Sequence, residues 1–157
     1  MIALSVVTAS QVASWRDSAT LYRRALALNS NSWLIHSNLA VILIGQGDVV
    51  GAKHHLQESI RLNPDFAEAR YNLGILYLDQ FHDCAMAIEN FVEAVRIRPG
   101  YADAHFYLGK AYIQSKQWRD AESEYRALML LDSRLAGMLK AMAAGDPSAF
   151  HDISGKE

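Results

Sequence analysis

Residues 67–101, AEARYNLGILYLDQFHDCAMAIENFVEAVRIRPGY, contain two apolar patterns of helical spacing on either side of a short turn. The first pattern consists of Ala69, Leu73, Leu76 and Tyr77, and the second of Ala87, Phe91, Ala94, Val95 and Ile97. Apolar residues three and four positions apart lie on one side of an α-helix, so each pattern predicts an amphipathic helix. Pro99 ends the stretch, because proline lacks the backbone N–H that a continuing helix needs. The stretch therefore predicts two helices joined by a turn at 81–83.

The same arrangement recurs along the chain at intervals of 34 or 35 residues. One series holds leucine, another alanine and a third a large apolar residue: Leu39, Leu73 and Leu108; Ala52, Ala87 and Ala121; Tyr22, Leu56, Phe91 and Tyr125. A period in this range is typical of stacked helical repeats, in which each unit buries one side on its neighbour. Since no useful length of the chain alternates apolar and polar residues, the sequence predicts an all-α fold.

The repeated unit resembles the tetratricopeptide repeat (TPR), whose two helices carry small residues, large apolar residues and a closing proline at fixed positions. The resemblance implies a right-handed superhelical TPR solenoid of antiparallel helix pairs. It divides the chain into an apolar N-terminal extension at 1–14 and a TPR domain at 15–144, followed by a flexible tail at 145–157. Within that domain it implies a half repeat at 15–32, repeats at 33–66, 67–101 and 102–135, and a capping helix at 134–144. The tryptophan often found at the fourth position of the family's units is replaced here by His36, Arg70 and His105.

Charge and cysteine content exclude several other classes of protein. The 157 residues include 15 Lys plus Arg against 17 Asp plus Glu, a formal charge of -2, whereas a general nucleic-acid binder would show a basic excess. The single cysteine, Cys84, cannot form a disulfide within the chain or build a cysteine metal cluster, and we interpret it as a small packing residue. We therefore expect no nucleic-acid partner.

The sequence carries no pattern of an active site or a metal site. It lacks the G-x-S-x-G, G-x-x-x-x-G-K-[ST] and G-x-G-x-x-G motifs of nucleophile elbows and phosphate-binding loops. The histidines do not form a zinc-binding helix motif, and we interpret them as solvated helix surface: His36, His54, His55, His82, His105 and His151. We therefore predict no catalytic residue, no cofactor and no bound metal, so the chain is not expected to be an enzyme.

The TPR resemblance implies where a partner would bind. In that family the first helices of successive units line a concave groove that receives peptides or partner helices. The corresponding residues are Ser37, Asn38, Val41, Ile44, Tyr71, Asn72, Ile75, Leu78, Phe106, Tyr107, Lys110 and Ile113. The lysine and asparagine clamp of the family's chaperone-binding members is absent, because its positions hold Ser37, Tyr71, Phe106, Val41 and Ile75. These residues imply a non-enzymatic scaffold that binds a protein or an extended peptide.

Two asparagines in this set carry a more specific resemblance. Asn38 and Asn72 stand at the sixth position of their units, where the long TPR array of O-GlcNAc transferase has asparagines that hold a peptide backbone. Tyr107 interrupts that series in the third unit. The alternative interpretation is that both are ordinary surface amides.

The N-terminal residues leave the context of the domain open. Residues 1–14 carry no charged side chain, which fits either an apolar stretch packed on the domain or the end of a membrane helix. As a continuation of the half-repeat helix they would expose apolar side chains, and such a surface promotes self-association or membrane binding. Residues 15–29 are similar to the junction after the last membrane helix of multi-pass, protein O-mannosyltransferase-like proteins. The alternative function is thus a substrate-presenting accessory domain of a membrane-bound protein glycosyltransferase whose catalytic part lies outside this chain. The location would be cytoplasmic for a free-standing protein and membrane-tethered for such a fragment.

Overall fold

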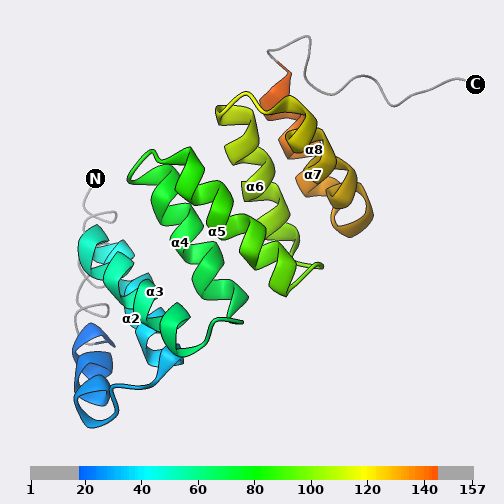
Figure 1. The fold of residues 1–157 in the computed structure, drawn as a ribbon. Helices are drawn as coiled ribbons and strands as arrows, with labels where there is room; N and C mark the ends of the chain where they lie inside the picture. The colour runs from blue at the N-terminus through cyan, green and yellow to red at the C-terminus, as the bar shows by residue number, and fades with distance from the viewer. Residues whose placement is uncertain (1–17, 145–157) are drawn as a thin grey trace, which may run out of the picture. The chain divides into compact units, whose positions relative to one another are not determined.

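The computed structural model describes residues 18–144, and this part of the chain consists of helices without a strand. Residues 18–28 are helical, and they are followed by α2 (Trp33–Gln46), α3 (Val49–Leu62), α4 (Ala67–Asp79), α5 (Cys84–Ile97), α6 (Ala102–Gln114), α7 (Trp118–Leu131) and α8 (Ser133–Ala143) (Figure 1). The all-α prediction is confirmed. The predicted N-terminal extension at 1–14 and the predicted tail at 145–157 lie outside the described residues.

The helix boundaries follow from stop and start signals in the sequence. Gly47 ends α2 in the left-handed conformation at φ 80°, which glycine adopts without a steric penalty, and its N–H bonds back to carbonyls of the last turn. Asp48 then starts α3, because its carboxylate accepts a hydrogen bond from the backbone N–H of Gly51 at 2.9 Å. Asp83 caps α5 in the same way by accepting from the N–H of Met86 at 3.0 Å.

The chain divides into two compact units, unit 1 at Met1–Leu73 and unit 2 at Gly74–Glu157. In unit 1, α2 packs against α3 through fully buried side chains of both helices: Leu39, Ala40, Leu43, Ala52 and Leu56. The ring of Trp33 at the start of α2 contacts that of Phe66, with centroids 4.5 Å apart. The buried hydroxyl of Ser59 on α3 donates to the Trp33 carbonyl at 2.8 Å, so a polar contact also joins the two helices.

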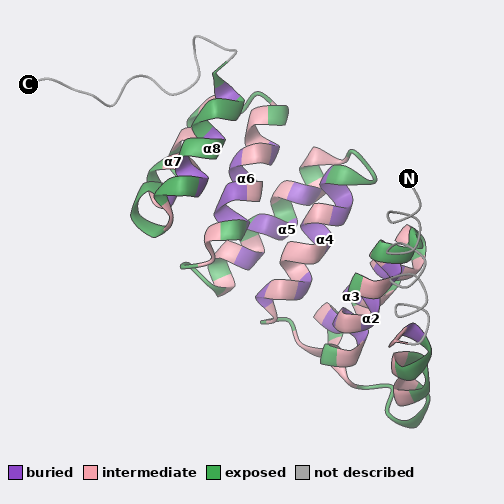
Figure 2. Cartoon of the chain, turned by 180° about the vertical axis from the view of Figure 1, so that it is seen from behind, coloured by how far each residue is buried: buried purple, intermediate pink, exposed green. Residues whose placement is uncertain are grey.

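In unit 2, α6 packs against α5, α7 and α8, and it is rich in buried positions (Figure 2). One buried cluster joins it to the last two helices: Phe106, Ala121, Leu128, Leu135, Ala136, Leu139 and Ala143. Gly74 on α4 lies against the ring of Phe91 on α5, so this helix pair is closely spaced. Small residues thus stand where helices approach, as the repeat pattern predicts.

The predicted capping helix is present as α8, but one detail of its predicted apolar face is wrong. The sequence pattern places Leu135, Met138, Leu139 and Met142 together on that face. Leu135 and Leu139 are buried, whereas Met138 and Met142 are exposed. The buried side also holds Ala136 and Ala143, whose small side chains allow α8 to lie close to α6 and α7. The helix is therefore rotated toward its alanines, and methionine rather than a fully polar surface faces solvent.

Within residues 18–144, no helix combines the length and the apolar character needed to cross a bilayer.

Candidate functional site

The twelve residues predicted to line the binding groove all lie on first helices of the repeats, and we call them the first-helix face. Six belong to unit 1, on α2 and the beginning of α4: Ser37, Asn38, Val41, Ile44, Tyr71 and Asn72. Six belong to unit 2, on the end of α4 and on α6: Ile75, Leu78, Phe106, Tyr107, Lys110 and Ile113.

In unit 1 the first-helix face combines one exposed apolar residue with two amides. Val41 is 51% exposed, and Asn38, Ile44, Tyr71 and Asn72 are half-buried. Within residues 18–144, no hydrogen bond engages the side-chain amide of Asn38 or of Asn72. Ser37, by contrast, is buried. In unit 1 the first-helix face therefore exposes one apolar side chain and carries two amides that form no hydrogen bond with the described residues.

In unit 2, two of the predicted face residues belong to the interior. Leu78 is buried, and Phe106 is only 9% exposed because it packs into the cluster formed by α6, α7 and α8. Phe106 is therefore part of the packing between these helices as well as a predicted groove residue. The remaining four, Ile75, Tyr107, Lys110 and Ile113, are half-buried and keep part of their surface accessible.

The ring of Tyr107 belongs to the accessible part of the first-helix face in unit 2. Its centroid lies 5.9 Å from that of the Phe91 ring and 5.6 Å from that of the Phe106 ring, which it meets edge-on. The Lys110 ammonium stands 5.2 Å above the Tyr107 ring and forms an ion pair with Asp79 of α4 at 3.0 Å. The sequence reading missed Asp79, although an acid at the end of one first helix and a lysine on the next are the signal for such a pair. The result is an aromatic surface bordered by a neutralised charge.

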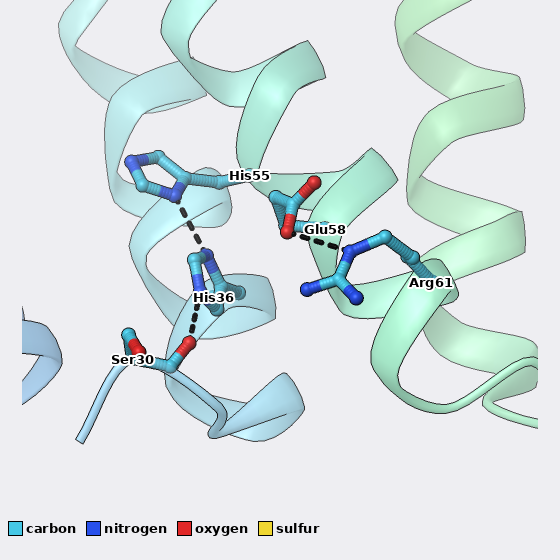
Figure 3. Close-up of polar contacts among 5 residues, drawn as sticks. All are labelled: Ser30, His36, His55, Glu58 and Arg61. Carbon is cyan, nitrogen blue, oxygen red and sulfur yellow. Dashed lines mark hydrogen bonds and ion pairs between the residues drawn. The ribbon is translucent and has the colours of Figure 1, made fainter.

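A second polar cluster lies in unit 1, between α2 and α3 (Figure 3). The Nδ1 atoms of His36 and His55 are 2.9 Å apart, and Nε2 of His36 is 3.1 Å from the Ser30 carbonyl oxygen. His36 is only 8% exposed. Burial, followed by the nearby His36, lowers the pKa of His55 below the usual value for histidine.

Unit 2 contains a counterpart of this cluster 69 residues further along the chain. Nδ1 of His105, which is 7% exposed, lies 2.6 Å from Glu124 Oε2, and its Nε2 lies 2.9 Å from the Pro99 carbonyl oxygen. The positions of His36 and His55 in unit 1 correspond to those of His105 and Glu124. The hydrogen bond to Glu124 raises the pKa of His105 above the usual value for histidine, against the effect of burial.

These contacts correct the interpretation of the histidines as solvated helix surface. It is wrong for His36 and His105, which are buried and bonded, and His55 is half-buried. His54 is exposed on α3, whereas His82 is exposed in the turn between α4 and α5 rather than on a helix. His151 lies outside the described residues. The partners of the two buried rings are 19 residues away on the second helix, a separation that the search for a zinc motif does not cover.

The described residues contain no group of three or more His, Cys, Asp or Glu side chains placed to hold a metal ion. Cys84 is half-buried at the start of α5, with Sγ 3.7 Å from Gln114 Oε1.

Comparison with protein-family models finds the description "Tetratricopeptide repeat" along most of the chain. One such model matches residues 8–52 and 43–81, and another matches residues 82–147. Among curated proteins, the chain is similar to Protein O-mannosyl-transferase Tmtc2 of Drosophila melanogaster, with 40% identity over 72 residues. This match covers 46% of the chain but only 8% of the length of that relative.

Solved structures with the same helical arrangement are more distant in sequence. MamA superposes with a TM-score of 0.71 at 24% identity, over 78% of this chain and 71% of that protein. YrrB, described as a TPR protein with an unusual peptide-binding site, has a TM-score of 0.71 at 18% identity, over 90% of this chain and 75% of that protein. The first TPR of Spaghetti (RPAP3), bound to the HSP90 peptide SRMEEVD, has a TM-score of 0.67 at 17% identity, over 74% of this chain and 94% of that protein. At these identities the likeness shows the fold.

Proposed function

Since the chain belongs to the tetratricopeptide repeat family, we propose that it is a non-enzymatic scaffold that binds an extended peptide through the first-helix face. Repeats of this type form protein–protein interaction scaffolds, and they bind proteins or peptides. The peptide held by the first TPR of Spaghetti, a structure of the same fold, supports this proposal.

The observation that carries the proposal is a pair of side-chain amides on unit 1 that form no hydrogen bond with the described residues. Asn38 and Asn72 are 34 residues apart, at the same position of successive repeats. A side-chain amide offers two N–H donors and a carbonyl acceptor, which match the C=O and N–H groups of a peptide backbone. Val41, half exposed and one helical turn from Asn38, offers apolar contact for a peptide side chain.

The first-helix residues of unit 2 favour a peptide with apolar side chains. Ile75, Tyr107 and Ile113 contribute accessible apolar and aromatic surface. The ion pair between Lys110 and Asp79 already satisfies the lysine, so Lys110 is not poised to hold a terminal carboxylate. Backbone recognition with apolar side-chain contacts fits this chemistry better than recognition of charge.

The experiment is selection of peptides from a phage-displayed random library, followed by affinity measurement on each selected peptide by fluorescence anisotropy. The double variant Asn38→Ala/Asn72→Ala removes about two hydrogen bonds at about 0.5–1.5 kcal/mol each, so binding weakens about 5- to 150-fold. Gln57→Ala changes an exposed polar residue on the second helix α3 and leaves affinity unchanged. Equal affinity of the double variant and the parent would place the binding surface elsewhere.

A second candidate function is favoured by the similarity to Protein O-mannosyl-transferase Tmtc2. In this alternative the same face presents an acceptor protein to the catalytic part of a membrane-bound protein glycosyltransferase, and that part lies outside this chain. The sequence of the transcript upstream of Met1 discriminates between the two. Several further hydrophobic segments in frame would support the accessory role, and unrelated sequence with a ribosome-binding site would contradict it.

A further inference from the structure

The hydrogen bonds of His36 determine which nitrogen carries its proton. Its Nε2 lies 3.1 Å from the Ser30 carbonyl oxygen, which can only accept, so Nε2 carries a hydrogen and donates. In the neutral ring Nδ1 of His36 is then an acceptor. His55 Nδ1, 2.9 Å away, must supply the hydrogen between the two rings. The neutral pair therefore satisfies both facing nitrogens with a single shared hydrogen.

This contact tolerates one additional proton but not two. A first proton can be taken up at Nε2 of His55, which leaves the hydrogen bond between the Nδ1 atoms intact. A second proton places hydrogens on both Nδ1 atoms, so neither ring can accept. Two imidazolium cations would then face each other with their Nδ1 atoms 2.9 Å apart and no hydrogen bond between them. This arrangement is unfavourable because His36 is almost fully buried and water cannot solvate its charge.

We propose that the His36–His55 contact is an acid-sensitive device of unit 1, which opens when both imidazoles are protonated and loosens α3 from α2. Loss of this contact affects the packing of the helices because of its location. It joins the two helices that form the core of the unit, and its second hydrogen bond joins α2 to the segment that follows the helix at 18–28. No catalytic or binding role of the first-helix face is needed for this response.

Some charged groups around the His36–His55 pair disfavour its protonation, and others favour it. Arg23 on the helix at 18–28 and His54 on α3 disfavour a proton on His55, and Asp48 at the start of α3 favours it. Glu58 is the acid near His36 on the same side of α3, and Arg61 already engages it at 3.0 Å (Figure 3). Because burial, His36, His54 and Arg23 together lower the pKa of His55, the folded unit binds fewer protons than the unfolded chain. Its stability is therefore lost as the pH falls below the ordinary histidine value.

The contact between His105 and Glu124 in unit 2 is an internal control, because protonation is expected to strengthen it rather than break it. Glu124 occupies the position of His55, and a carboxylate accepts the hydrogen bond of a protonated imidazole. Protonation of His105 therefore strengthens its contact with α7, whereas double protonation of the His36–His55 pair breaks the contact with α3. Replacement of His55 by glutamate converts the His36–His55 arrangement into one like that of His105 and Glu124.

Hydrogen exchange measured by mass spectrometry tests the proposal in each unit separately, in buffer with EDTA so that metal binding cannot contribute. Exclusion of one proton predicts that protection factors of α2 and α3 amides fall about tenfold between about pH 7.5 and about pH 5.5. Protection of α6 and α7 is expected to be unchanged or to rise. In the His55→Glu variant the fall in α2 and α3 is lost or reversed.

His55→Gln serves as the second variant, because its amide can donate to His36 Nδ1 but cannot take up a proton. It is expected to lose the acid response as well, whether or not His55→Glu folds. The proposal is overturned if the parent shows no fall in α2 and α3, or if the same fall persists in His55→Gln.

Discussion

The ring of Phe91 lies directly against the backbone of Gly74, so closely that a Cβ atom at position 74 would be 2.6 Å from Phe91 Cε1. Both residues stand at fixed positions of the repeat, on the first and second helix of one pair. The glycine sets how closely α4 approaches α5 within unit 2, and the phenylalanine, fully buried, fills the contact.

Gly74→Ala is expected to destabilise unit 2 by about 1–3 kcal/mol, because the Phe91 ring or the helix must move to accept the methyl group. Gly137→Ala on α8 is the matched control, since a Cβ there meets nothing within 4 Å. The control should stabilise the protein by up to about 1 kcal/mol through helix propensity. Urea unfolding of both variants measures the difference. If both substitutions stabilise equally, the packing of α4 on α5 is not as described.

Phe106→Ala is expected to lower the free energy of unfolding by about 3–5 kcal/mol, because it empties the cluster between α6, α7 and α8. Val41→Ala, at an exposed position of α2, should change it by no more than about 0.5 kcal/mol. Thermal unfolding followed by circular dichroism measures both. Equal melting temperatures for Phe106→Ala and the parent would show that Phe106 is a surface residue after all. Phe106 is accordingly unsuitable as a probe of peptide binding.

The two aromatic neighbours Phe106 and Tyr107 show what the sequence could and could not predict. The repeat period places both on the first helix α6, and this was enough to predict the helices, their order and the positions of Ala121 and Gly74 at close contacts. The period does not fix how far each helix is rotated toward its neighbours. That rotation depends on α8, whose alanines let it approach, and it buries Phe106 while Tyr107 stays half exposed.

The burial of the histidines could not be predicted from the repeat pattern, for a different reason. Whether His36 and His105 are solvated depends on single contacts with the second helix, to His55 and to Glu124. The repeat pattern specifies large and small residues but not which polar groups meet. A residue-by-residue alignment of the repeats places His36 at the position of His105 and His55 at that of Glu124. It does not show that the two positions meet, which only the packing of the two helices determines.

Glu124→Gln is expected to flatten the pH dependence of unit 2. The hydrogen bond to Glu124 raises the pKa of His105 above its unfolded value of about 6.5, so its stabilisation is complete below that pH. As the pH rises through the raised pKa, the proton leaves and this stabilisation is lost. The parent should therefore lose resistance to urea as the pH rises above about 6.5, and the glutamine variant should not show the loss that comes from His105. A parallel loss in the parent and the variant would assign the pH dependence to other groups.

Gln117→Asp is expected to stabilise α7 by about 1 kcal/mol. Gln117 stands at the repeat position of Asp48 and Asp83, whose carboxylates cap α3 and α5, yet its own side chain makes no capping hydrogen bond. Its backbone, at φ -89° and ψ 71°, nearly matches that of Asp48 at φ -83° and ψ 73°, so an aspartate here is already oriented to accept a backbone N–H of the first turn. The cost is the exposed hydrogen bond from Gln117 Nε2 to Ser115 Oγ, which contributes little because water replaces it. Gln117→Asn tests the hydrogen bond without the charge and should retain most of the gain, whereas Asp48→Ala should lose about 1 kcal/mol in unit 1. Urea unfolding of the three variants decides the matter: if Gln117→Asp gains nothing while Asp48→Ala loses stability, the start of α7 differs from that of α3 despite the matching backbone.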